Sequence, residues 1–272
     1  MSRLLAIAVV LCFWLPTEVY GQKWASVTGD NFVVHSAVAD LPPDRVLSLC
    51  RSLRRSLTVA WCGSESTTLW QPKCEIVVHD SLTSYLRVVG SGAAQTMGTS
   101  LIELDSQCVV SRRIDLIVGP QGNLPALPHE LTHVVLADRF QGRQPPHWFD
   151  EGAAMLADTD EKQALHERDC RYALQTGTVL PLHQLLHLDQ FTSAEQMPAF
   201  YGQSASLLRF LCDRGEITKA TQFSLDATAR GYEHALQTHY AIASVGELEK
   251  QWKQFAYQQD AKLTTLQVRF TP

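Results

Sequence analysis

Several kinds of sequence feature are missing from this chain of 272 residues. It has no internal repeat and no low-complexity tract, which argues against a repeat protein. Beyond the first residues, no segment is apolar over the roughly 20 residues that a membrane-spanning helix needs. Basic residues are dispersed except for a small cluster at 51–55, and the formal net charge is −5. A nucleic-acid-binding surface is therefore not expected.

Cysteine patterns of the Cys-x-x-Cys type are also absent, which argues against a cysteine zinc site or a redox motif. Of the 7 cysteines, Cys12 lies in the N-terminal apolar segment, and the others are Cys50, Cys62, Cys74, Cys108, Cys170 and Cys212. An even number in a secreted chain predicts disulfide bonds. We expect one bridge between Cys62 and Cys74, which flank a polar loop. The alternative is that several are buried free thiols.

The N-terminus has the form of a secretory signal peptide. Arg3 precedes an apolar run from Leu4 to Leu15, and Val19 and Gly21 fit the −3 and −1 positions of a cleavage site. The run is too short to make a good membrane anchor. We expect residues 1–21 to be removed, leaving a secreted or periplasmic protein without a stable membrane anchor.

The most informative segment is 129–133, which reads His-Glu-Leu-Thr-His. Residues four apart lie on one face of a helix, so His129 and His133 could bind the same metal ion. Glu130 is rotated by about 100° from His129, so it could reach a metal-bound water without being a ligand. Two imidazoles and one nearby carboxylate are the arrangement of a zinc hydrolase. The alternative is a surface helix with two unrelated histidines.

The flanking residues favour the metal site. Prolines at 125 and 128 fit a first helical turn, Gly142 fits a helix end, and the predicted helix runs from about 126 to 141. A catalytic zinc needs a third protein ligand. Glu151 fits this role if a second helix begins near Asp150, with Asp150 as its N-cap and Glu151 in its first turn.

Two other residues, His147 and Asp150, are alternative third ligands. His147 follows two prolines and precedes the second helix, so we expect it at the rim of the site. Asp150 would point away from the metal ion if it caps the helix. The metzincin pattern requires histidine at position 139, where this chain has Arg139.

The motif at 129–133, followed by Trp-Phe-Asp-Glu-Gly-Ala-Ala at 148–154, resembles the gluzincin zinc metallopeptidases, above all the secreted peptidase MA-like domains. Segments 201–211 and 231–252 are also similar to helices of that family. The resemblance implies a zincin-like fold with Glu151 as the third ligand. Two positions depart from the pattern, because many members have Asn where Asp150 stands, and thermolysin-type members have Asp where Met155 stands. The residues that orient the two histidines are therefore not identified.

The pattern of apolar residues predicts an α+β protein with an α/β lobe at 22–124 and a mainly helical lobe at 125–272. Strands are expected at 32–35, 74–78 and within 103–118, and helices at 43–60 and 81–89. We expect a small mixed sheet, with zinc in the groove between the lobes. By resemblance, residues 113–118 are either an edge strand that pairs with an extended substrate or an ordinary interior strand.

The predicted function is a zinc metallopeptidase that hydrolyses a peptide or protein substrate, with Glu130 as general base. Tyr201 is the candidate donor to the oxyanion, because we expect it to start a helix facing the groove. Weaker candidates lie on the C-terminal helix: Tyr232, His234, His239 and Tyr240. No aminopeptidase motif for a free N-terminus occurs, which favours endopeptidase action. Two other functions fit these residues: hydrolysis of a non-peptide amide or ester, and a non-catalytic zinc-containing binding module.

Overall fold

A computed structural model describes residues 24–105, 108–141, 143–191 and 193–258; the expected signal peptide lies outside them. The described chain has a mixed α+β fold, with one small mixed sheet and many helices, as predicted at this level. The strands are β1 (Ala25–Thr28), β2 (Phe32–Ser36), β3 (Cys74–His79), β4 (Gly98–Asp105) and β5 (Cys108–Ile117). The helices are α1 (Pro43–Cys62), α2 (Leu82–Val89), the 3₁₀ turn η1 (Ser91–Ala93), α3 (Leu127–Arg139), α4 (His147–Leu156), α5 (Asp160–Thr176), α6 (Leu182–Leu185), α7 (Gln196–Asp213), α8 (Ile217–Arg230), α9 (Tyr232–Tyr240) and α10 (Val245–Gln258). None of these helices is long and apolar enough to cross a membrane.

The strand order is β1-β2-β3-β5-β4, in which β2, β3 and β5 are parallel and the two outer strands run antiparallel to their neighbours. Residues 113–117 pair with β3 on one side and with β4 on the other. Of the two alternatives for residues 113–118, the structure therefore shows the interior strand, and β4 is the edge. Residues 98–105 form a strand of their own that turns back on β5 and covers its free side.

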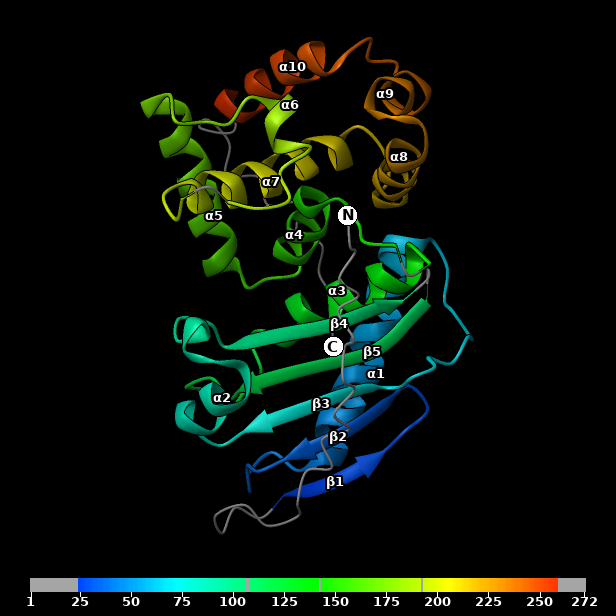
Figure 1. Cartoon of the computed structure of the whole chain (residues 1–272), viewed down its shortest axis with the longest axis vertical. Helices are drawn as coiled ribbons and strands as arrows, with labels where there is room; N and C mark the ends of the chain where they lie inside the picture. The colour runs from blue at the N-terminus through cyan, green and yellow to red at the C-terminus, as the bar shows by residue number, and fades with distance from the viewer. Residues whose placement is uncertain (1–23, 106–107, 142, 192, 259–272) are drawn as a thin grey trace, which may run out of the picture.

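Helix α1 packs against the sheet through one apolar face. Residues spaced three or four apart on it are buried, among them Val46, Cys50, Leu53 and Leu57. The helix ends at Gly63, whose φ of 84° is left-handed and whose N–H bonds the Val59 carbonyl. In Figure 1, α1 lies across one face of the sheet. Helix α3 contacts α1, so α3 packs against the sheet half of the molecule.

Helix α3 lies where the sheet meets the remaining helices, and it contacts β4, β5, α1 and α4. Helices α4–α10 occupy the other half of the molecule (Figure 1). Within that half α4 and α7 approach closely, because a Cβ on Gly152 would lie 2.8 Å from the Ser204 carbonyl oxygen. Glycine at 152 thus sets the distance between the helix that carries Glu151 and its neighbour.

The six cysteines of the described residues are free thiols, so the expected bridge between Cys62 and Cys74 is not formed. Cys74 points into the core from the first residue of β3, and burial raises the pKa of its thiol, with the neighbouring Cys50 adding to the rise. Cys62 lies at the end of α1, where the charges that act on it are those of Arg139, Asp138 and Arg54. Cys62 and Cys74 thus have different neighbours, although the loop between α1 and β3 connects them.

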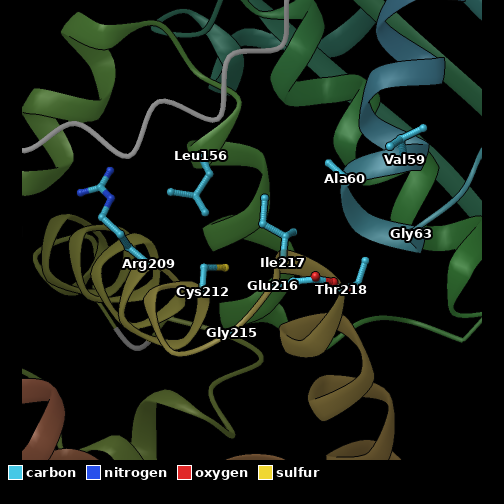
Figure 2. Close-up of a pocket in the computed structure, with 10 residues that line it drawn as sticks. All are labelled: Val59, Ala60, Gly63, Leu156, Arg209, Cys212, Gly215, Glu216, Ile217 and Thr218. Carbon is cyan, nitrogen blue, oxygen red and sulfur yellow. Dashed lines mark hydrogen bonds between the residues drawn. The ribbon is translucent and has the colours of Figure 1, made fainter.

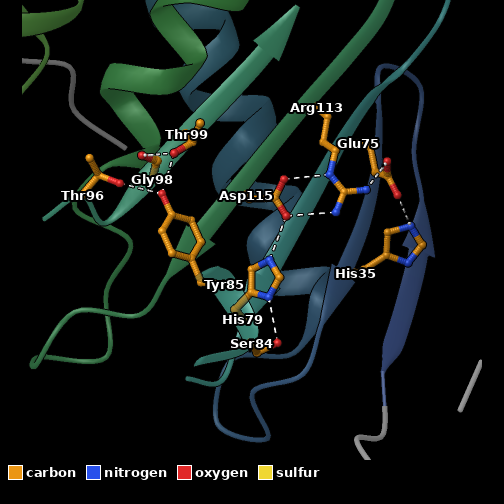
Figure 3. Close-up of polar contacts among 10 residues, drawn as sticks. All are labelled: His35, Glu75, His79, Ser84, Tyr85, Thr96, Gly98, Thr99, Arg113 and Asp115. Atoms are coloured by element: carbon orange, nitrogen blue, oxygen red, sulfur yellow. Dashed lines mark hydrogen bonds and ion pairs between the residues drawn. The ribbon is translucent and has the colours of Figure 1, made fainter. Parts of the chain in front are cut away.

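A polar network on the sheet joins β3, β5 and α2 (Figure 3). The ring of His79 bonds Asp115 through Nε2 at 2.8 Å and Ser84 through Nδ1 at 3.0 Å. The guanidinium of Arg113 donates to both oxygens of Asp115, at 2.7 and 2.9 Å. Burial acts to raise the pKa of Asp115, but hydrogen bonds from His79 and Arg113 outweigh it and leave the pKa below its usual value. With Asp115 ionised, the network therefore links the parallel strands β3 and β5.

Candidate metal centre

Helix α3 carries the two histidines and the glutamate of the 129–133 motif. The ring centroids of His129 and His133 are 5.1 Å apart, as expected for neighbours one helical turn apart. Pro128 sits in the first turn, where its missing N–H leaves no hydrogen bond broken. The side chains of His133 and Glu130 are buried, each residue being 9% exposed. The predicted helix is thus formed, and it holds the motif in the interior at the junction of the two halves.

Helix α4 brings Glu151 to these histidines. Its carboxylate oxygen Oε2 lies 4.0 Å from Nε2 of His129, and one donor atom from each of His129, His133 and Glu151 lies within 4.8 Å of the others. Tetrahedral zinc with bonds of about 2.1 Å separates its ligand atoms by about 3.4 Å. Small side-chain rotations would close that difference. Two imidazoles and a carboxylate, partly shielded from water, are a donor set that suits zinc.

The capping role expected for Asp150 is wrong. Pro146 is the N-cap of α4, whose first residue is His147, so Asp150 and Glu151 are the fourth and fifth residues of the helix. The helix starts earlier because Pro146 supplies an extended φ/ψ with no N–H to satisfy. Asp150 is thereby free for a contact with α3.

Each histidine has a carboxylate behind it, which the sequence did not reveal. Nδ1 of His129 bonds Asp158 Oδ2 at 3.1 Å. Asp150 Oδ2 lies 3.0 Å from Nδ1 of His133, at ion-pair distance but outside hydrogen-bond geometry. Because an ionised carboxylate only accepts, these contacts favour a proton on each Nδ1 and leave each Nε2 lone pair for a metal ion. Asp158 lies three residues after Met155 and is the carboxylate that contacts His129.

The carboxylates dominate the electrostatics of the site. Burial acts to lower the pKa of His133, but the charges of Asp150, Glu151 and Glu130 raise it to about 10. Burial acts to raise the pKa of Asp158, but the hydrogen bond from His129 helps to hold it well below its usual range. The arrangement thus favours a positive charge between the histidines, and a divalent cation would satisfy it in place of a proton.

Tyr201 lies on α7 close enough to Glu151 for the two to interact electrostatically. Burial and then the charge of Glu151 raise the pKa of its phenol to about 12, so the hydroxyl stays protonated at neutral pH. The ring packs against Phe191 and Phe200. Tyr201 is the sixth residue of α7 rather than its first, because the helix begins at Gln196.

The weaker candidates have other partners. The Tyr232 hydroxyl accepts from Trp148 Nε1 at 2.9 Å and donates to the Leu186 carbonyl. Nε2 of His239 lies 3.2 Å from Asp226 Oδ2, and the ring of Tyr240 packs against Phe223 and the ammonium of Lys219. His234 lies 4.0 Å from the same Asp226 oxygen. These contacts tie His234, His239 and Tyr240 to α8, and they tie Tyr232 to α4 and to the end of α6.

The edge strand β4 passes directly beside Glu130. A Cβ built on Gly98, the first residue of β4, would lie 3.0 Å from Glu130 Cγ. Exposure rises along the strand, from buried at Gly98 to exposed at Asp105. The outermost strand of the sheet therefore begins next to the candidate general base.

A separate cavity of about 410 Å³ lies between the end of α1, the last turn of α4 and the junction of α7 and α8 (Figure 2). Its lining is mainly apolar and includes Leu156 and Ile217. The Arg209 guanidinium points away from the α1 side in Figure 2 and donates to Glu167 and Gln163. None of the three donor residues lines this cavity, so it is not part of the metal centre.

No family model matches the chain, and no curated protein is significantly similar to it. The interpretation of the site therefore rests on its residues and their geometry. Among the described residues, one group of three or more His, Cys, Asp or Glu side chains has the spacing to bind a metal ion: His129, His133 and Glu151.

Proposed function

We propose that this chain is a secreted or periplasmic zinc-dependent metallopeptidase with a zincin-like fold, its zinc ion held in the groove between the sheet half and the helical half. The observation that carries the proposal is the convergence of donor atoms from His129, His133 and Glu151 within 4.8 Å. Glu130 lies beside them on α3 and outside the donor set. That division between three ligands and one free carboxylate is what hydrolysis requires.

A bound zinc ion would supply a water of lowered pKa and an electrophile for the scissile carbonyl. Glu130 would accept the proton of the attacking water and return it to the leaving amine. Tyr201 would donate its phenolic hydrogen to the oxygen on which negative charge develops. Its raised pKa keeps that hydrogen in place at neutral pH. Asp150 and Asp158 hold the two imidazole rings from behind.

A peptide is the substrate that best fits the neighbouring strand edge. An extended chain could pair with the backbone of β4, which is the sheet edge nearest to Glu130. Backbone pairing gives affinity with little sequence selectivity, and it suits cleavage within a chain. The proposal is therefore an endopeptidase acting on peptides or unfolded proteins.

Two alternatives remain open to experiment. The same residues could hydrolyse a non-peptide amide or ester, since they determine the water chemistry and not the leaving group. A non-catalytic zinc module would need the three ligands but no general base. The presence of Glu130 beside the donor set favours an enzyme, because a site that only binds zinc needs the three ligands and no general base.

The first experiment is elemental analysis of the mature protein beside Glu151→Ala, with Glu161→Ala as the control. Glu161 is an exposed acid in the first turn of α5. We expect one zinc ion per chain in the wild type and the control, and much less in Glu151→Ala. A wild type that takes up no zinc when zinc is offered would refute the proposal.

The second experiment measures chelator-sensitive cleavage of quenched fluorescent peptides. Glu130→Gln should retain zinc and lose roughly 10²–10⁴-fold in rate, the range that a general base contributes. Zinc binding without cleavage of peptides, but with cleavage of amide or ester probes, would support the first alternative. Zinc binding without any turnover would support the second.

A further inference from the structure

The turn between α4 and α5 carries Asp158, the carboxylate that contacts His129. The side chain of Asp158 is 1% exposed, and its Oδ2 lies 3.1 Å from His129 Nδ1. The backbone N–H of Asp158 bonds the Met155 carbonyl at 3.2 Å, so the turn follows directly on the last residues of α4. A shift of this turn would move the carboxylate away from the imidazole. The contact with His129 therefore depends on what holds the turn.

Gln163, the fourth residue of α5, holds this turn with its side chain. Its Nε2 donates to the Asp158 carbonyl at 2.9 Å and to the Leu156 carbonyl at 3.3 Å. A side-chain amide nitrogen has two hydrogens, so both bonds can form at once. One side chain thus connects α5 to the last residue of α4 and to the residue that carries the carboxylate.

The amide of Gln163 is oriented from its other side by Arg209 of α7. Arg209 Nη2 donates to Gln163 Oε1 at 3.2 Å, while Nη1 donates to Glu167, one turn further along α5. A guanidinium can only donate and a carbonyl can only accept, which assigns Oε1 to Arg209 and Nε2 to the turn. Arg209 is itself buried, with 8% exposed. Helix α7 therefore sets the direction in which Gln163 donates.

Two other side chains contact Asp158, and they act on its carboxylate. Lys162 Nζ lies 3.3 Å from Oδ1, and His166 Nε2 lies 3.8 Å from Oδ2. Gln163 acts instead on the backbone on both sides of Ala157. Its bonds come from a neutral amide, so they do not depend on the charge of any group at the metal site.

We propose that Gln163 is a positioning residue for the metal site: by bonding the backbone at Leu156 and Asp158, it keeps the Asp158 carboxylate behind His129. This inference rests on the metal site of the proposed function. Each backbone rotation that is fixed beforehand reduces the entropy lost when a metal ion is bound. Arg209 acts through Gln163, because it fixes the amide that fixes the turn.

The test measures zinc affinity of Gln163→Met and Gln163→Glu in competition with a chromogenic chelator. Methionine is as long as glutamine but lacks both donors. Glutamate keeps an oxygen for Arg209 and places its other oxygen against the two carbonyls. Residues behind metal ligands contribute about 10–100-fold to affinity, and both variants should lose about 10-fold, the lower end of that range.

The direction of the Gln163→Glu effect separates geometry from charge. An added negative charge would by itself strengthen the binding of a cation, whereas a displaced turn weakens it. The matched controls are Gln175→Met and Gln175→Glu, at an exposed glutamine of the same helix. Both controls should bind zinc as the wild type does.

A double-mutant cycle tests whether Gln163 acts through Asp158. In the Asp158→Ala background, Gln163→Met should weaken zinc binding no further. Wild-type affinity of Gln163→Met, even with a lowered melting temperature of the zinc-free protein, would overturn the inference and leave the proposed function intact. The same loss in both backgrounds, or tighter binding by Gln163→Glu, would also overturn it. A wild type that binds no zinc would overturn both.

Discussion

Gly98 offers a test of the contact between the edge strand and the candidate general base. A Cβ at this position would lie 2.7 Å from Ala126 Cβ and 3.0 Å from both Glu130 Cγ and a Leu116 methyl. Carbon atoms in contact are normally about 3.5–4.0 Å apart, so the substitution Gly98→Ala overlaps by about 1 Å with atoms on three sides. Ala126 cannot rotate its methyl group away, and Leu116 is fully buried. The Glu130 side chain is the neighbour that can move.

The expected cost follows from these distances. Overpacking of a core costs about 1–3 kcal/mol, and the loss of glycine freedom in the unfolded chain returns about 0.4–1 kcal/mol. Gly98→Ala should therefore lower the free energy of unfolding by about 1–2 kcal/mol in a denaturant titration. A misplacement of about 1 Å in a catalytic group can reduce the rate about 100-fold. We expect kcat/KM for peptide cleavage to fall by about 10–100-fold with zinc content unchanged.

The matched control is Gly92→Ala. No atom lies within 4 Å of a Cβ built on Gly92, and its φ is not left-handed. This variant should keep wild-type stability and rate. The reasoning is refuted if Gly98→Ala matches the wild type in both measurements, or if it loses zinc, because then the displacement reaches the ligands and not Glu130 alone.

Two further predictions concern buried carboxylates. Asp158→Asn removes the charge behind His129 and should weaken zinc binding by about 10–100-fold in a chelator competition. The control Asp160→Asn, at an exposed residue, should bind zinc as the wild type does. Equal zinc affinity of Asp158→Asn and the wild type would exclude a role for Asp158. Asp115→Asn should lower the free energy of unfolding at neutral pH by on the order of 3 kcal/mol, because it leaves Arg113 without its main partner. Since the pKa of Asp115 is lowered in the folded state, its contribution is present above about pH 4 and is lost as the pH falls further. The stability difference between variant and wild type should therefore shrink in acid, and a constant difference would contradict the shift.

What the sequence predicted well depends on local spacing. Helix α1 follows from apolar periodicity, and α3 follows from its flanking residues, such as Pro128 in its first turn. The convergence of His129 and His133 needs only one helical turn, and that of Glu151 needs one close helix pair. These features are set within short stretches of chain, so the pattern of residues suffices to indicate them.

The features that the sequence did not indicate depend on where helices and strands end and on which of them pack together. Asp158 reaches His129 because α4 ends at Leu156 and the chain turns before α5. No spacing rule for residues within one helix gives the position of that turn. Cys62 and Cys74 are close in sequence, but Cys74 lies near Cys50, about three helical turns before Cys62 on α1, so counting cysteines misled. The order of β4 and β5 likewise depends on tertiary pairing.

The β4–β5 hairpin has a consequence for local motion. Gly98–Leu101 pair with the part of β5 that is itself paired to β3, whereas Ile102–Asp105 pair with residues 108–112, which β3 does not reach. The hairpin thus changes along its length from the margin of a sheet to a two-stranded ribbon, and an isolated ribbon is marginally stable in water. Amide hydrogens should exchange slowly near Glu130 and progressively faster toward Asp105. An extended ligand lying along β4 would then meet a rigid backbone close to the metal-binding residues and a backbone able to adjust its twist farther away.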